Sequence, residues 1–147
     1  MKTKLLLTFF ITCMIVGCSH RNPVEDAKAV LISHEQFSKA GDLEGIMSNM
    51  AEDVIFLAPG IPLLKGKEAC RNFYNGMLKM GKTEFTHNYD GAEIIGDAVI
   101  LHGLATGTTT MPDSSVIHFA NNFIITVKYQ HDGKMKLWRG AFAPSSQ

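Results

Sequence analysis

The sequence has no excess of charge of either sign. Its 147 residues carry 14 lysines and arginines against 14 aspartates and glutamates, so the formal net charge is zero. Proteins that bind nucleic acid concentrate basic residues on one face or helix, and no such cluster occurs here. The six histidines also lack the i, i+4 helical spacing of a zinc site. We therefore expect no nucleic-acid partner, no metal and no cofactor.

Long hydrophobic runs are missing except at the start of the chain. Residues 5–16 are apolar apart from two threonines, and they follow Lys2 and Lys4. The run is shorter than the ~20 residues that a membrane-spanning helix needs. A positive start and a short apolar stretch are typical of a secretory signal. The string Ile15-Val16-Gly17-Cys18 resembles the lipobox of bacterial lipoproteins. That resemblance implies that residues 1–17 are removed.

Cysteine is scarce, and its three positions bear on where the protein works. The lipobox resemblance implies that Cys18 carries lipid and anchors the protein in a bacterial cell envelope. Ser19 is similar to the residue that permits transfer to the outer membrane, facing the periplasm, in a Gram-negative cell. The alternative is an ordinary secreted protein with a free thiol at Cys18. Cys13 leaves with the signal, so Cys70 has no partner for a disulfide that would stabilise the fold.

Helical periodicity begins after a short polar tether, residues 18–22. Apolar residues recur at helical spacing over 23–40, which predicts a first helix. Residues 41–42 are a glycine that stops this helix and an aspartate that can cap the next. A short strand over 54–57 and a third helix over about 66–80 follow. Three helices are therefore expected before residue 81.

The second half of the chain alternates between apolar and polar residues, as strands do. The predicted strands are 85–90, 98–110, 116–129 and 134–142. Short turn sequences separate them, which favours hairpins. The predicted fold class is α+β, with a cone-shaped, strongly curved antiparallel sheet packed against three N-terminal helices in the order α-α-β-α-β-β-β-β. The domain is expected over 23–143, with a tail at 144–147.

Six short strings along this chain occur in a recognisable order. They are Ala40-Gly41-Asp42-Leu43, Met50-Ala51-Glu52-Asp53-Val54, Ala58-Pro59-Gly60, Gly66-Lys67-Glu68-Ala69, Gly96-Asp97-Ala98 and Asp132-Gly133-Lys134. Their order and spacing resemble the nuclear-transport-factor-2-like (NTF2-like) superfamily, in its SnoaL-like and ketosteroid-isomerase-like branch. The resemblance implies a cone-shaped pocket that isomerases, cyclases, dehydratases and non-catalytic binders share. Function has to be argued from the site itself.

The resemblance also allows one reaction to be tested. Ketosteroid isomerases use an aspartate base, together with a tyrosine and a protonated aspartate that hold the enolate oxygen. Carried over to this chain, the base position is Ala58, the oxyanion aspartate position is Ile125 and the tyrosine position is His34. Alanine and isoleucine cannot move a proton. Steroid isomerase chemistry is therefore not expected, and the sequence leaves the question of catalysis open, leaning against it.

The inward faces of the strands and helices predict an aromatic-rich pocket. Its expected lining residues are His34, Phe56, Tyr74, His87, Tyr89, Asn121, Phe123, Trp138 and Phe142. An apolar pocket with a few polar groups is the usual form of a small-molecule site. His34 and His87 are the candidates for an acid or base near neutral pH. The alternative for each is a hydrogen-bonded core residue.

Three functions are compatible with these patterns. The leading hypothesis is a lipid-anchored, non-catalytic protein that binds a small apolar or aromatic ligand. The first alternative is an enzyme of the isomerase, cyclase or dehydratase type that uses a pocket histidine. The second is a protein–protein interaction module, which the polar residues Asn122, Thr126 and Lys128 on the outer strand face disfavour. A homodimer stays open.

Overall fold

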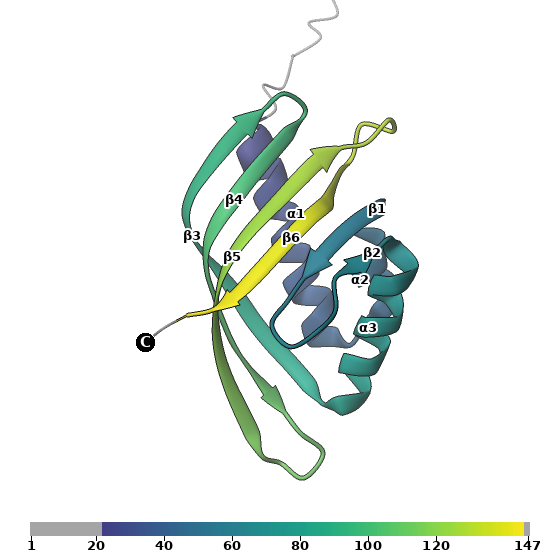
Figure 1. The fold of residues 1–147 in the computed structure, drawn as a ribbon, viewed down its shortest axis with the longest axis vertical. Coiled ribbons are helices and arrows are strands. Elements are labelled where there is room, and N and C mark those ends of the chain that lie inside the picture. Colours follow the sequence, from purple (N-terminus) through teal and green to yellow (C-terminus); the bar gives the residue numbers. More distant parts are fainter. Residues whose placement is uncertain (1–21, 146–147) are drawn as a thin grey trace, which may run out of the picture.

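Figure 1 shows the fold in a computed structural model, which describes residues 22–145. The expected signal peptide at 1–17, the lipid-carrying Cys18 and all but the last residue of the tether lie outside the described residues. So do the last two residues of the tail. Within the described part of the chain, no helix is long and apolar enough to cross a membrane.

The first helix begins and ends, and the second helix begins, at residues that the sequence marks, whereas Met50, expected on the second helix, opens the first strand. α1 (Pro23–Ala40) has proline in its first turn, where the side chain of Asn22 accepts a backbone N–H at 3.1 Å. It ends at Gly41, whose φ of 70° is left-handed and favours glycine. α2 (Leu43–Ser48) is capped by Asp42, whose Oδ1 accepts a backbone N–H at 2.9 Å. Both predicted helix starts are confirmed.

The remaining elements follow the predicted order with one addition. They are β1 (Met50–Leu57), β2 (Leu64–Lys65), α3 (Lys67–Met80), β3 (Lys82–Ile95), β4 (Ala98–Thr110), β5 (Val116–Tyr129) and β6 (Met135–Pro144). β2 was not predicted, because a strand of two residues has no alternation to detect. It pairs with Ile55 and Phe56 of β1. β3 is also longer than its alternating pattern indicated.

The strands form one sheet in the order β2-β1-β6-β5-β4-β3. Every pair is antiparallel except β1 and β6, which run parallel. The predicted α+β class is confirmed, and the fully antiparallel sheet is corrected to a mostly antiparallel one. A long connection that contains α3 and four strands lets β6 return beside β1 in the same direction. The sheet curves around the helices in Figure 1.

α1 positions the site because one side of it packs into the curve of the sheet. Its buried residues are Ala27, Leu31, His34 and Ser38, at helical spacing. β3 runs alongside, as contacts along the helix show: Glu35 reaches His87, and Lys28 lies over the ring of Tyr89. His34 therefore points into the core, as its spacing predicted.

The outer face of the sheet carries an exposed apolar residue between the polar residues that the sequence places there. Ile124 of β5 is 59% exposed. It pairs with Ala141 of β6, and Ala141 pairs in turn with Leu57 of β1. Asn122 and Thr126, two residues to either side of Ile124, are the polar residues expected on this face. The homodimer stays a prediction.

Candidate functional site

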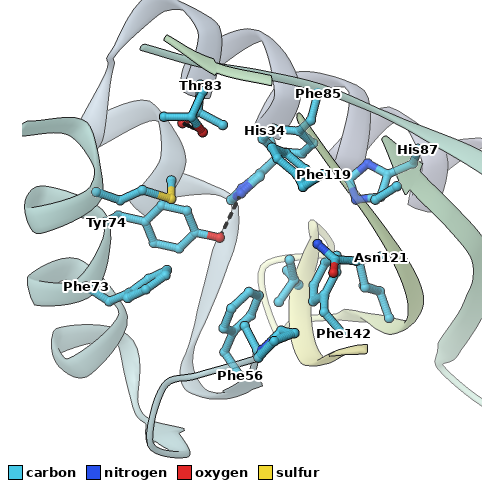
Figure 2. A pocket seen from close by; sticks show the side chains of 17 residues that line it. His34, Phe56, Phe73, Tyr74, Thr83, Phe85, His87, Phe119, Asn121 and Phe142 are labelled. Atoms are coloured by element: carbon cyan, nitrogen blue, oxygen red, sulfur yellow. Dashed lines mark hydrogen bonds between the residues drawn. The ribbon is translucent and has the colours of Figure 1, made fainter. Parts of the chain in front are cut away.

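A cavity of about 260 Å³ lies between α3 and the inner face of the sheet. Six of the nine residues predicted to line a pocket do line it: His34, Phe56, Tyr74, His87, Asn121 and Phe142. Figure 2 shows Tyr74 on one side, and Asn121 and His87 on the other. Residues that the sequence did not single out complete the wall, among them Phe73, Phe85 and Phe119. Phenylalanine and tyrosine supply six of the seventeen lining residues.

Trp138 does not line the cavity, and its predicted inward orientation is wrong. Across the β5–β6 ladder, Thr126 pairs with Arg139 but Val127 pairs with Leu137, so β6 holds one extra residue at this point. Such a bulge resets the alternation of side chains along a strand. The Trp138 indole instead donates to Asp53 at 2.8 Å, and the Arg139 guanidinium lies 3.8 Å from its ring centroid.

Tyr89 and Phe123 lie behind the cavity wall. The ring of Phe123 is 2% exposed and meets His87 edge-on, with 4.9 Å between centroids. Tyr89 stacks against His87 at 6.3 Å. Neither residue is among those that line the cavity. Both therefore hold the His87 ring in place rather than forming the pocket surface.

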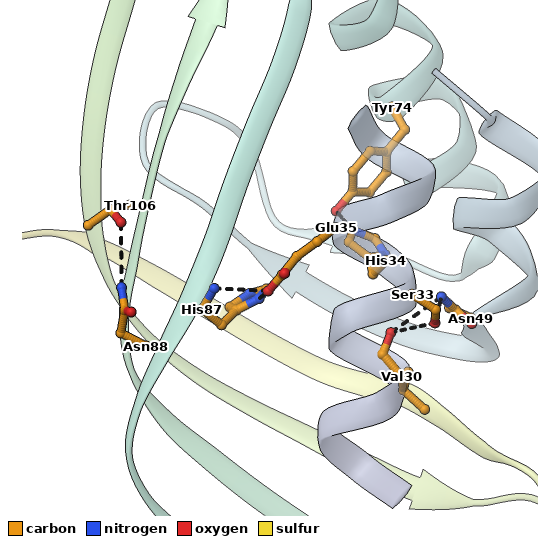
Figure 3. Close-up of polar contacts among 9 residues, drawn as sticks. All are labelled: Val30, Ser33, His34, Glu35, Asn49, Tyr74, His87, Asn88 and Thr106. Carbon is orange, nitrogen blue, oxygen red and sulfur yellow. Dashed lines mark hydrogen bonds and ion pairs between the residues drawn. The ribbon is translucent and has the colours of Figure 1, made fainter. Parts of the chain in front are cut away.

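His87 is held by a carboxylate that the sequence analysis did not identify. Oε1 of Glu35, on α1, lies 2.7 Å from Nδ1 of His87 and 2.9 Å from its backbone nitrogen. Figure 3 shows this carboxylate between α1 and β3. The His87 side chain is 2% exposed and that of Glu35 is 15% exposed. An isolated glutamate on an amphipathic helix is usually a solvated charge, so no signal in the sequence marked it.

The contacts of Glu35 fix the proton on one nitrogen of His87. An ionised carboxylate only accepts hydrogen bonds, so Nδ1 must carry the hydrogen that it donates to Oε1. In the tautomer that carries its single ring proton on Nδ1, Nε2 is an acceptor. It is buried, and no described residue hydrogen-bonds to it. A carboxylate that orients an imidazole in this way leaves the opposite ring nitrogen as the one able to take a proton.

His34 and Tyr74 form a second pair in which both groups are neutral. Nε2 of His34 lies 3.1 Å from the Tyr74 hydroxyl. Burial and, as a smaller cause, the nearby His87 lower the pKa of His34 to about 3. Burial also raises the pKa of Tyr74 well above its usual range. His34 is therefore unprotonated near neutral pH, and of the two candidate histidines only His87 has the arrangement of a base.

The positions that would carry ketosteroid isomerase chemistry are apolar in the structure. Ala58 and Ile125 both line the cavity, as the resemblance implied, and neither can exchange a proton. Among the described residues around the cavity none is Lys, Arg, Asp or Glu. No group of His, Cys, Asp and Glu in residues 22–145 could hold a metal ion.

Comparison with protein families decides the relationship. Residues 34–138 match the model of the SnoaL-like domain. The chain belongs to the SnoaL-like family. This match covers α1 from His34 onward and extends through Trp138 in β6. It therefore contains both His87 and the carboxylate that holds it.

Solved structures show that the SnoaL-like domain has the NTF2-like fold. A ketosteroid isomerase-like protein from Erwinia carotovora atroseptica is 15% identical, with 86% of this chain and 99% of that chain covered and a TM-score of 0.76. An NTF2-like superfamily protein from Salmonella enterica is 10% identical, with 85% and 92% covered and a TM-score of 0.73.

A third structure is described as a dehydratase candidate. This NTF2-like protein from Streptomyces avermitilis is 16% identical, with 85% of this chain and 98% of that chain covered and a TM-score of 0.74. Proteins of the same fold thus include proposed isomerases and dehydratases. Identities this low establish the shared fold only. A search of curated proteins finds no significant match.

Proposed function

We propose that this SnoaL-like domain is an acid–base enzyme of the isomerase or dehydratase type, acting on a small ring compound with His87 as the base. The observation that carries the proposal is the Glu35–His87 pair, which leaves Nε2 of a buried imidazole without a hydrogen-bond partner on a residue that lines the cavity. A buried polar group without a partner costs free energy, so its persistence is typical of a functional site.

The reaction would transfer a proton from the substrate to His87 and then return it. Nε2 takes the proton from a carbon next to a carbonyl group, and the ring becomes an imidazolium. The Glu35 carboxylate, 2.7 Å from Nδ1, stabilises that positive charge. Return of the proton to another carbon completes an isomerisation, whereas its transfer to a departing hydroxyl group releases water. Among the polar residues that line the cavity, Asn121 has an amide group that can donate to the carbonyl oxygen. The Tyr74 hydroxyl can do so in the arrangement in which it accepts from Nε2 of His34.

Proton exchange in heavy water tests this proposal without knowledge of the natural substrate. Beta-tetralone is an uncharged two-ring ketone with acidic hydrogens next to its carbonyl group. We expect the purified domain to accelerate replacement of these hydrogens by deuterium, as followed by proton NMR. Exchange at the buffer rate over a range of such ketones would contradict catalysis.

A non-catalytic binding protein is the second candidate, and a specific observation favours it. Ala58 and Ile125 present only apolar atoms at the positions where ketosteroid isomerases carry their acids. For this function the cavity would hold an aromatic ligand, and His87 would only orient it. Native mass spectrometry of the protein purified from its own cells would detect a retained compound. A ligand that is released unchanged after incubation in heavy water supports binding over catalysis.

We also propose that the domain is anchored in a bacterial envelope through lipid on Cys18, a proposal that rests on the lipobox resemblance. Replacement of Cys18 by alanine is expected to abolish labelling by radioactive palmitate and to release the protein from the membrane fraction. One acyl-bearing residue must supply the anchoring, because the chain has no net positive charge that would bind an anionic bilayer.

The chain contains a matched control for this experiment. Cys13 lies in the same apolar stretch but five residues before Cys18. Cys13→Ala should leave both palmitate labelling and sedimentation with membranes unchanged. Sedimentation of the Cys18→Ala protein with membranes, at the level of the unaltered chain, would contradict lipid anchoring at this residue.

A further inference from the structure

The hydrogen-bonding state of His87 restricts the chemistry of the ligand. We infer that the natural ligand is an uncharged ring compound that presents a hydrogen-bond donor, an O–H group, to Nε2 of His87. The inference rests on the cavity being the ligand site, as the proposed function also requires, and it adds the class of compound. It is tested by binding alone, so its failure and a failure of catalysis are distinguishable.

The requirement for a donor follows from the two contacts of a single oxygen. Oε1 of Glu35 accepts from both the backbone N–H and Nδ1 of His87, at 2.9 and 2.7 Å. Rotation of the ring to present Nδ1 to the cavity would break the shorter of these bonds. Nε2 therefore offers a lone pair, and no described residue donates to it. A carbonyl or ether oxygen placed there would face a second acceptor, whereas a hydroxyl group satisfies it.

The absence of positive charge around the cavity argues against an anionic ligand. None of its lining residues is lysine or arginine, and His34 stays neutral. A carboxylate beside His87 would meet the Nε2 lone pair and, behind the ring, the negative charge of Glu35. Burial of an unpaired charge in such a site is unfavourable. A neutral hydroxyl group carries no such cost.

The volume and the walls of the cavity indicate the size of the ring system. A cavity of about 150 Å³ accepts one benzene molecule, so about 260 Å³ leaves room for two fused rings. The rings of Phe56, Phe73 and Phe142 form one wall, with centroids 6.1 Å apart for the first two and 5.4 Å apart for Phe56 and Phe142. Flat aromatic ligands pack favourably against such rings.

Three probes that share one ring skeleton separate these requirements. Beta-naphthol has a hydroxyl donor, beta-methoxynaphthalene has only an acceptor at the same carbon, and beta-naphthoate has an anionic group there. We expect the naphthol to bind at least about tenfold tighter than the methoxy compound, because the ether leaves the buried Nε2 without a partner. Naphthoate should bind weakest of the three. Isothermal titration calorimetry at pH 8 measures all three affinities.

Two matched variants test whether His87 is the acceptor. His87→Phe removes the acceptor and keeps a ring, so it should bring the naphthol and methoxy affinities within about twofold of each other. His34→Phe alters the other buried cavity histidine and should keep the preference for naphthol. Equal binding of naphthol and methoxynaphthalene by the unaltered protein, tighter binding of naphthoate, or no naphthol binding at millimolar concentration would each overturn the inference. So would a preference that disappears only in His34→Phe. The comparison of probes in the unaltered protein stands even if a variant fails to fold.

Discussion

Replacement of His87 by phenylalanine is expected to lower the rate of proton exchange in beta-tetralone by a factor of about 10²–10⁴, the usual contribution of a positioned general base. The variant should fold, because the new ring occupies the same space between Phe85 and Phe123, whose centroids lie 5.4 and 4.9 Å from the imidazole. Exchange rates from proton NMR, with near-ultraviolet circular dichroism as the check on folding, measure both effects.

Two further variants separate catalysis from packing. Glu35→Gln keeps an oxygen that can accept from Nδ1 and from the backbone N–H, but it removes the charge that stabilises the imidazolium. It should therefore retain the fold and lose part of the rate. His118→Phe makes the same substitution as His87→Phe at an exposed residue of β5 and should leave the rate unchanged. Full activity in a folded His87→Phe protein would exclude His87 as the base.

Acidification from about pH 6.5 to pH 4 is expected to destabilise the protein, mainly because His34 is buried in its neutral form. An unfolded histidine takes up a proton below about pH 6.5. In the folded protein burial lowers the pKa of His34 to about 3, so the ring stays neutral across that interval. The unfolded state then binds more protons than the folded state, and the free energy of unfolding falls as pH decreases. The expected loss approaches 1.4 kcal/mol per pH unit and reaches roughly 3 kcal/mol by pH 4.

The slope of stability against pH, rather than its absolute value, tests the role of His34. His34→Phe cannot take up a proton, so its free energy of unfolding from urea titrations should change much less between pH 6.5 and 4.5. Its absolute stability also reflects the Tyr74 hydroxyl, which loses its partner. Carboxylates with lowered pKa values, such as Glu44 and Asp53, are mostly exposed, and their protonation lowers the free energy of unfolding only at more acidic pH. Parallel slopes for the two proteins would rule out a buried neutral His34.

The fold could be predicted largely from the sequence because its signals are local. The cap at Asp42, the stop at Gly41 and the hairpin turns each act over a few residues. The order of helices and strands follows from them. The parallel β1–β6 pair could not be predicted in this way, since it joins segments about 80 residues apart and depends on how the whole sheet closes.

The site was harder to predict because its decisive features depend on tertiary contacts. Alternation predicted Phe142 at the cavity but failed for Trp138, where one extra residue in β6 reverses the sides. His87 was found as a polar residue on an apolar face, yet its partner Glu35 is 52 positions away on another element. Only the packing of α1 against β3 brings these two groups together.

α1 also separates the N-terminal tether from the cavity. This distance matters if the tether carries the membrane anchor. Five residues, 18–22, extend at most ~18 Å, and the twelve residues from Pro23 to His34 add about 16 Å of rigid helix. In the proposed anchored form the helix acts as a spacer between the bilayer and the cavity. Ligand could then exchange with the surrounding aqueous space while the protein stays on the membrane. The lipid would hold the protein at the membrane, and the ligand would reach the cavity from the aqueous compartment.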